Sequence, residues 1–336
     1  MFFLDIFDEK TLITMKNYQK NLFELLLKES GGKKNLVDIM IDKLALSNDT
    51  AYRRISGRSH ITLNEGISLA SHFGVSLDLI HNAAPNNAVL NKIHDIYNID
   101  DLEMYFDSSI RNLQKVKNNP DVEFIYAAKD IPLFYFMRFE NLRKFKIYAW
   151  LKLMDAVFFS QRISFEDFEI PEKISQKAIL LSEVYNDVSS TEIWSNVTIY
   201  TLLEQIIYFH QLELINTENA LKICEEITEM LTQIEEEVIS EKKESLKLYQ
   251  NDLLIMNNSV FIRFSDQKML FLPYNILSYY YTLDERVCGN YEKSLELILK
   301  NSELLSSNNK ARYIFFNKMY KKVEGIKKML QTYHQS

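Results

Sequence analysis

Glycine, proline and cysteine are all scarce in this chain. Its 336 residues include seven glycines and five prolines, far below the average usage of about 7% and 5%. Because strands that alternate with helices need many turn residues, this composition predicts a mostly helical fold. The two cysteines, Cys224 and Cys288, lie in no C-x-x-C or similar spacing. We therefore expect two small buried side chains, with neither a disulfide framework nor a metal site.

Signals for membranes and secretion are missing as well. The sequence has no run of about eighteen uncharged apolar residues, which a transmembrane helix would need. The first ten residues, MFFLDIFDEK, carry acidic groups where a secretory signal would carry lysine or arginine. With 47% apolar and 25% charged residues, the chain is expected to be a cytoplasmic globular protein of two or three domains.

Catalytic patterns are also absent. The six histidines are scattered, without H-E-x-x-H spacing, and the chain has neither a G-x-S-x-G elbow nor a glycine-rich phosphate loop. The many carboxylates form charge runs, and no spacing singles out a pair for acid–base work. The sequence therefore predicts no enzyme, no cofactor and no metal.

The most informative segment runs from Asn35 to Asp78. Its first part predicts a helix, because apolar residues recur at helical spacing at Leu36, Val37, Met40, Ile41 and Leu44. After Ala45 and Leu46, Ser47 can cap a second short helix over residues 48–56, which Gly57 then closes. The spacing turns Ala51 and Ile55 toward a core. It leaves an outward polar side made of Asn48, Asp49, Tyr52 and Arg53, with Arg54 at its edge.

The flanking residues extend this pattern into a small bundle. Thr62 and Glu65 form a capping box before an apolar stripe that ends at Gly74, and Ser76 can cap one more short turn. An earlier helix is indicated by Met15, Tyr18, Leu22, Leu25 and Leu26, and it ends at Gly31 and Gly32. Residues 15–82 are thus predicted to form about five short helices around one core.

These residues resemble the lambda repressor and Cro type of helix-turn-helix regulators. The segment LNEGISLASHFGVSLDLI is similar to the fourth and fifth helices of that family, and the resemblance covers about a quarter of the chain. The chain differs from the family in two places. Ala45 stands where the turn most often begins with glycine, and Arg54 stands where an apolar residue is common. The resemblance implies sequence-specific binding to double-stranded DNA, usually as a dimer on a two-fold symmetric site.

The charge of the chain varies along its length. The formal balance is −7, whereas most DNA-binding domains are basic. Residues 31–60, however, hold six cations against three aspartates, a local balance of +3 that leaves −10 for the remainder. A basic segment within an otherwise acidic chain is compatible with specific DNA binding. Salt screens the repulsion between the acidic part and the DNA phosphates beyond about 8 Å.

Eight residues are predicted to contact DNA. We expect Arg53 and Arg54 to engage guanine edges or phosphates, and Tyr52 and Asn48 to contact base edges or the sugar-phosphate backbone. For Arg54 an ion pair with Asp49 or Glu65 is an open alternative. The whole set is Lys33, Lys34, Asn48, Thr50, Tyr52, Arg53, Arg54 and Arg58.

Beyond a linker over residues 83–90, which is rich in turn residues, the sequence predicts a helical domain over 91–336. Apolar periodicity indicates helices over residues 99–117, 132–155, 173–188, 191–212, 217–249, 284–305 and 309–331. One β-hairpin is expected as an insertion near 252–273. The fold class is therefore all-α, and stacked antiparallel helix pairs are one arrangement that remains open.

Two segments of this domain can be interpreted either as packing within the chain or as a binding surface. The aromatic and cationic run of residues 130–150 is interpreted as core packing, with a ligand or partner surface as the alternative. The heptad-like seam of the helix from Thr217 is interpreted as packing within the chain, with a dimerising coiled coil as the alternative.

The sequence thus favours a dimeric transcriptional regulator, in which the C-terminal domain dimerises, senses an effector, or does both. Two other functions stay open. In one, the helix-turn-helix is degenerate and the chain is a protein interaction scaffold. In the other, the C-terminal domain holds a pocket for a small-molecule or peptide effector, which makes the protein a ligand-switched regulator.

Overall fold

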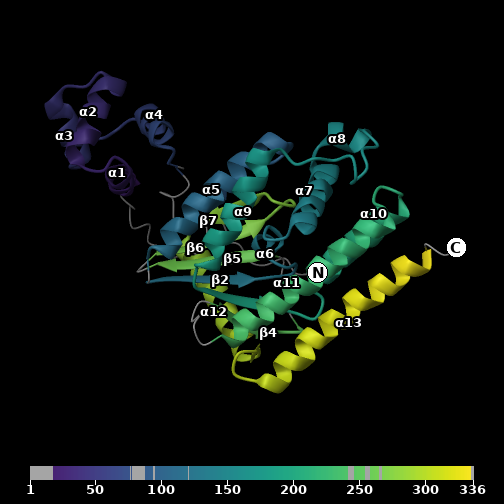
Figure 1. Cartoon of the computed structure of the whole chain (residues 1–336). Helices are drawn as coiled ribbons and strands as arrows, with labels where there is room; N and C mark the ends of the chain where they lie inside the picture. Colours follow the sequence, from purple (N-terminus) through teal and green to yellow (C-terminus); the bar gives the residue numbers. More distant parts are fainter. Residues whose placement is uncertain are drawn as a thin grey trace, which may run out of the picture. The chain divides into compact units, whose positions relative to one another are not determined.

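The structure is a computed structural model (Figure 1). It describes residues 18–75, 77, 88–93, 95–119, 121–240, 246–253, 258–264 and 267–333. The chain divides into two compact units, residues 1–89 (unit 1) and 90–336 (unit 2). Each unit is described by itself.

Unit 1 is a small helical bundle. Its described helices are α1 (Tyr18–Glu29), α2 (Lys33–Leu44), α3 (Asn48–Ile55) and α4 (Leu63–Phe73). All four contribute to one core, whose buried members are Leu22, Phe23, Leu26, Leu36, Val37, Met40, Ala51, Leu69 and Ala70. The fifth short helix predicted after Ser76 lies outside the described residues, apart from Leu77, which packs against this core.

Unit 2 contains an eight-stranded mixed sheet, so the prediction of an all-α fold is wrong. The strands are β1 (Asn91–Lys92), β2 (Val122–Ala127), β3 (Ser190–Trp194), β4 (Leu246–Gln250), β5 (Ser259–Phe264), β6 (Gln267–Pro273), β7 (Tyr279–Thr282) and β8 (Glu303–Leu304). Their order across the sheet is β1-β7-β6-β5-β2-β3-β4-β8.

The central strands β2, β3 and β4 run parallel, and every other pairing is antiparallel. Strands β5 and β6 form an antiparallel pair in the region where the sequence predicts an inserted hairpin, with Phe264 opposite Gln267. Because β5 also pairs with β2 along its whole length, the two strands belong to the sheet and are not an insertion among helices.

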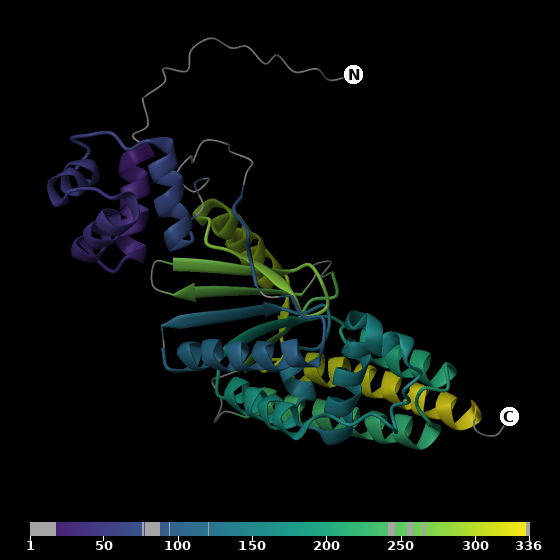
Figure 2. The same ribbon diagram turned by 90° about the horizontal axis from the view of Figure 1, so that it is seen from above.

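Helices cover both faces of this sheet (Figures 1 and 2). The described helices of unit 2 are α5 (Ile99–Lys117), α6 (Leu133–Phe136), α7 (Glu140–Met154), α8 (Ala156–Ser160), α9 (Glu172–Asn186), α10 (Tyr200–Gln211), α11 (Thr217–Ile239), α12 (Glu285–Lys300) and α13 (Asn309–Tyr333). Strand β2 shows the division. Phe124 and Tyr126 face the large core shared with α5 to α11 and α13, whereas Ile125 and Ala127 face a smaller core with α12.

The sequence pattern did not predict the sheet, because several of its strands directly precede or follow long helices and fell within the predicted helical segments. Strand β3 lies at the start of the segment predicted as helix over 191–212, and β4 and β8 lie at the ends of 217–249 and 284–305. Parallel strands are joined by helices, not by tight turns. Among the helices that lie between these strands, α8 and α11 begin at the polar caps Asp155 and Asn216. A shortage of glycine therefore does not exclude such a sheet.

Both of the ambiguous segments are packed within unit 2. The rings of Phe134, Phe136, Phe139, Phe145 and Trp150 are buried in the large core, so core packing is confirmed for them. The seam residues of α11 are also buried, and α11 packs against α7 and α13. That seam is therefore not exposed to form a coiled coil with another chain.

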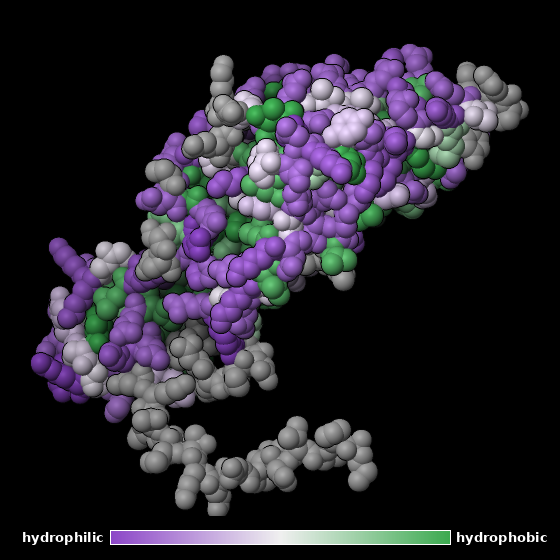
Figure 3. Space-filling model, turned by 90° about the horizontal axis from the view of Figure 1, so that it is seen from below, coloured by the Kyte–Doolittle hydropathy of each residue, from purple (hydrophilic) through white to green (hydrophobic). Residues whose placement is uncertain are grey.

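The surface shown in Figure 3 is mainly hydrophilic, with smaller hydrophobic patches between polar groups. None of the helices in the described ranges has the length and apolar content to cross a membrane.

Candidate nucleic-acid interface

The turn between α2 and α3 sets the position of the predicted reading helix. Helix α2 ends at Leu44 and is followed by its C-cap Ala45, whose backbone is left-handed with φ 51° and ψ 41°. Ser47 then caps α3, and its Oγ accepts a hydrogen bond from the Thr50 amide at 3.3 Å. The capping role predicted for Ser47 is thus confirmed. The Thr50 hydroxyl contacts the Ser47 hydroxyl at 2.8 Å, so Thr50 supports the cap.

The C-terminal end of α3 is capped at Gly57, as the sequence predicts. Gly57 has φ 76°, a left-handed conformation that glycine adopts with little strain. The Arg58 amide donates to the Arg53 carbonyl at 2.8 Å, and the Gly57 amide donates to the Arg54 carbonyl at 3.0 Å. These two bonds form a Schellman motif, which satisfies carbonyls at the helix end. A helix of two turns is therefore fixed at both ends.

Helix α3 has one buried and one exposed side. Ala51 is fully buried against the unit 1 core, and Ile55 is half-buried. Asn48, Tyr52 and Arg53 are exposed. Arg53 lies 3.9 Å from Asp49 in an exposed ion pair, and such pairs contribute only about 0 to 1 kcal/mol. The guanidinium of Arg53 can therefore exchange this pair for another acceptor at little cost.

One cation of the predicted set, Lys33, lies beside this exposed side. The Lys33 ammonium, at the first position of α2, lies 5.1 Å from the centre of the Tyr52 ring. This cation–π distance places the start of α2 beside the middle of α3. Lys34 and Arg58 are exposed as well. The structure thus brings Lys33 and Tyr52 together, as the predicted interface requires.

Arg54 forms an ion pair within the protein, which is the alternative to a DNA contact that the sequence left open. It forms an ion pair with Glu65 on the first turn of α4, and only 15% and 20% of the two side chains are exposed. Glu65 also completes the predicted capping box with Thr62, which is confirmed. Burial raises the pKa of the Glu65 carboxyl, but hydrogen bonds from Arg54 and Thr62 outweigh burial and lower this pKa overall. Arg54 therefore links α3 to α4.

Gln19 is a supporting residue that the sequence analysis did not find. Its Nε2 donates to the carbonyls of Arg54 and Ser59, both at 2.8 Å, and its Oε1 accepts from the Ile61 amide at 3.1 Å. These three bonds tie α1 to the last turn of α3 and to the loop between α3 and α4. Because all partners are backbone groups, their side-chain identities carry no signal from which the contact could be predicted.

Comparisons with protein-family models, curated proteins and solved structures find no match for this chain. Among the residues that the structure describes, no three His, Cys, Asp or Glu side chains group in a way that could hold a metal ion.

Proposed function

We propose that this protein is a sequence-specific DNA-binding transcriptional regulator that acts in the cytoplasm and inserts α3 into the major groove. One observation carries the proposal. Helix α3 is anchored by the buried Ala51 and fixed at both ends, and it presents Asn48, Tyr52 and Arg53 to solvent. A short rigid helix with one polar, cationic side meets the steric and chemical needs of base readout.

Base contacts are assigned to the exposed side of α3. Arg53 would donate to guanine O6 and N7, and Asn48 and Tyr52 would contact adjacent base edges or sugar-phosphate groups. Because Arg54 is already paired with Glu65, its first role in this proposal is to hold α3 against α4. A contact from Arg54 to DNA would have to compete with that pair.

Phosphate contacts are assigned to Lys33, Lys34 and Arg58. Helix α2 begins after Gly32 without a side-chain cap among the described residues, so its first amides can donate to a phosphate oxygen. The lysines at its first two positions add positive charge at the same place. Phosphate contacts of this kind position the protein without reading sequence.

The proposal includes a homodimer. Unit 1 presents one short reading helix, and the balance of the chain outside residues 31–60 is acidic. One copy would thus make few phosphate contacts, whereas two copies on a two-fold symmetric site would double them. Unit 2 is the larger unit and supplies the dimer surface in this proposal.

Selection from a random duplex library at about 150 mM salt tests the proposal. The wild type is compared with Arg53→Ala and with Arg111→Ala, which removes an exposed arginine from α5 in unit 2. We expect the wild type and Arg111→Ala to enrich the same two-fold symmetric motif. Arg53→Ala should lose about 1 to 3 kcal/mol on that motif and relax the preference at one base pair in each half-site.

Two results would contradict the proposal. If the wild type enriches no sequence, or if Arg53→Ala and Arg111→Ala enrich the wild-type motif equally well, α3 does not read DNA. Stable capture of a protein partner by a chain that ignores DNA would favour the scaffold function instead.

A further inference from the structure

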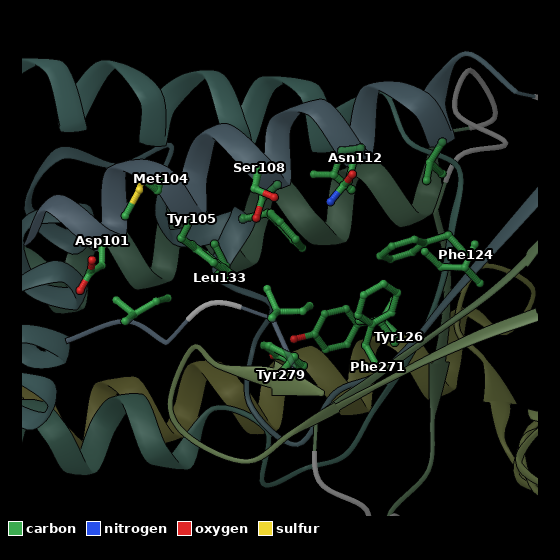
Figure 4. Close-up of a pocket in the computed structure, with 18 of the residues that line it drawn as sticks. Asp101, Met104, Tyr105, Ser108, Asn112, Phe124, Tyr126, Leu133, Phe271 and Tyr279 are labelled. Atoms are coloured by element: carbon green, nitrogen blue, oxygen red, sulfur yellow. The ribbon is translucent and has the colours of Figure 1, made fainter. Parts of the chain in front are cut away.

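Unit 2 holds a cavity of about 170 Å³, partly open to solvent, between α5 and one side of the sheet (Figure 4). Side chains of α5 line one wall, and side chains of β2, β5, β6 and β7 line the opposite wall. In Figure 4, Ser108 and Asn112 on α5 lie across the cavity from Tyr126, Phe271 and Tyr279 of the sheet.

The cavity exists because α5 is held toward α9. The Lys177 ammonium of α9 contacts Glu103 at 2.7 Å and Asp107 at 2.5 Å on α5. Phe106, on the same helix, is fully buried in the large core. These contacts fix one side of α5 over the helical layer, and its neighbouring side faces the sheet across the cavity. The gap is therefore a product of the packing of α5.

The walls are mainly apolar. Ile93, Ile96, Leu113, Phe124, Leu133, Phe134, Val260, Ile262 and Phe271 provide most of them. An engineered apolar cavity of about 150 Å³ in another protein stays dry and binds benzene. A volume of 170 Å³ therefore fits one aromatic ring with a short substituent.

A few polar side chains interrupt the apolar walls of the cavity. Burial raises the pKa values of Tyr126 and Tyr279 above the usual range, so both phenols stay protonated near neutral pH. The phenol groups of Tyr126 and Tyr279 are hydrogen-bonded to each other. With Tyr126 as the donor, the Tyr279 proton is left for another acceptor. Ser108 and Asn112 add neutral polar groups on the α5 side.

The charges at the cavity disfavour an anion. Among the described lining residues there is no lysine, arginine or histidine, whereas Asp95 and Asp101 lie on the wall. Asp95 is held ionised, because hydrogen bonds from Lys92, Tyr274 and Tyr97 lower its pKa to about 2. A carboxylate ligand would thus lose its hydration without gaining a cation.

We propose that this cavity binds a small uncharged aromatic molecule with one hydroxyl or carbonyl group, which accepts a hydrogen bond from Tyr279. The apolar walls favour the ring, the volume limits the ligand to about one ring, and an anionic group would find no cation among the described lining residues. The proposal concerns binding to unit 2 alone, so it stands or falls independently of DNA recognition.

Calorimetric titration of the full chain with benzyl alcohol and with benzoate tests the charge and ring requirements. We expect saturable binding of benzyl alcohol in the millimolar range or tighter, and benzoate at least about tenfold weaker. No saturable binding of benzyl alcohol, or equal binding of benzoate, would overturn the proposal.

Two matched substitutions place the ligand. Ser108→Trp puts an indole into the cavity, whereas Ser294→Trp makes the same change on the exposed surface of α12. Ser108→Trp should lower the affinity for benzyl alcohol at least about tenfold and Ser294→Trp should leave it unchanged, with circular dichroism confirming that both fold. Equal affinities for the two variants would place the ligand elsewhere.

Tyr279→Phe tests the hydrogen bond and keeps the ring in place. It should weaken benzyl alcohol by about threefold to tenfold and leave toluene, which has no acceptor, unaffected. If this variant weakens both ligands equally, Tyr279 contributes packing only, and the polar part of the proposal is wrong.

Discussion

Arg54 at the end of α3 and Glu65 at the start of α4 form an ion pair that is largely shielded from solvent. The pair crosses from the proposed reading helix to its neighbour. Gln19 reinforces the same junction through the carbonyl of Arg54. The orientation of α3 is thus set by side chains that do not themselves face outward.

Arg54→Ala is expected to destabilise this junction. Removal of the guanidinium leaves the shielded Glu65 carboxylate without its main partner, which should cost about 1 to 3 kcal/mol. Hydrogen exchange of the full chain, read on peptides from α3 and α4, measures the change locally. Arg53→Ala is the matched control, because its guanidinium is exposed, and it should leave exchange unchanged. Equal exchange in the two variants would contradict a structural role for Arg54.

Ala45→Gly is expected to stabilise unit 1. A left-handed backbone costs a residue with a Cβ about 1 to 2 kcal/mol, while glycine gives back about 0.5 to 1 kcal/mol through its freedom in the unfolded chain. The net gain should be up to about 1.5 kcal/mol, seen as slower exchange of α2 and α3. Ala311→Gly, within the right-handed α13, should instead destabilise its own helix by about 1 kcal/mol. A loss of protection in Ala45→Gly would show that the turn is unstrained.

Lys33→Ala should weaken binding to all DNA sequences alike. If Lys33 contacts a phosphate, its loss removes one released counterion, and the slope of log affinity against log salt should fall by about 1. Lys115→Ala, which removes an exposed lysine from α5 in unit 2, is the control and should leave the slope unchanged. A Lys33→Ala variant with an unchanged salt slope would refute the phosphate contact.

The helices of unit 1 could be predicted from the sequence because their capping residues act locally. Ser47, the Thr62 and Glu65 box, and Gly57 each act within a few residues of the helix end that they fix. Their chemistry is therefore visible in the order of residues alone. The Arg54 pair depends on how α3 meets α4, so the sequence could offer it only as an alternative.

The sheet of unit 2 depends on contacts that are distant in the chain. Strand β2 pairs with β3 and β5, from which it is separated by whole helices. In β3 the run STEIW also places Glu192 on a buried face, and an acidic residue there hides the apolar pattern of a strand. Only the folded chain supplies the partners that make this position acceptable.

The burial of Glu192 makes it the source of a pH-dependent stability. The carboxylate is fully buried and accepts hydrogen bonds from Tyr135 and Tyr185 at 2.6 Å and from the Trp194 indole at 2.7 Å. Burial is the dominant effect and raises its pKa above the ordinary 4.5, although the three donors oppose this. An acid with a raised folded-state pKa contributes stability that is complete below its unfolded pKa and is lost as pH rises through the folded pKa.

Glu192→Gln should therefore remove a specific part of the pH dependence. As pH rises above about 4.5, the free energy of unfolding of the wild type should fall relative to that of Glu192→Gln, because the unfolded wild type releases a proton that the folded state keeps. Urea unfolding of both proteins over a pH series measures this difference. Glu225→Gln, at an exposed position on α11, controls for the loss of a carboxylate at the surface. A difference between wild type and Glu192→Gln that stays constant with pH would mean that the hydrogen bonds balance burial at Glu192. A wild type that gains stability relative to Glu192→Gln as pH rises would mean that they outweigh burial.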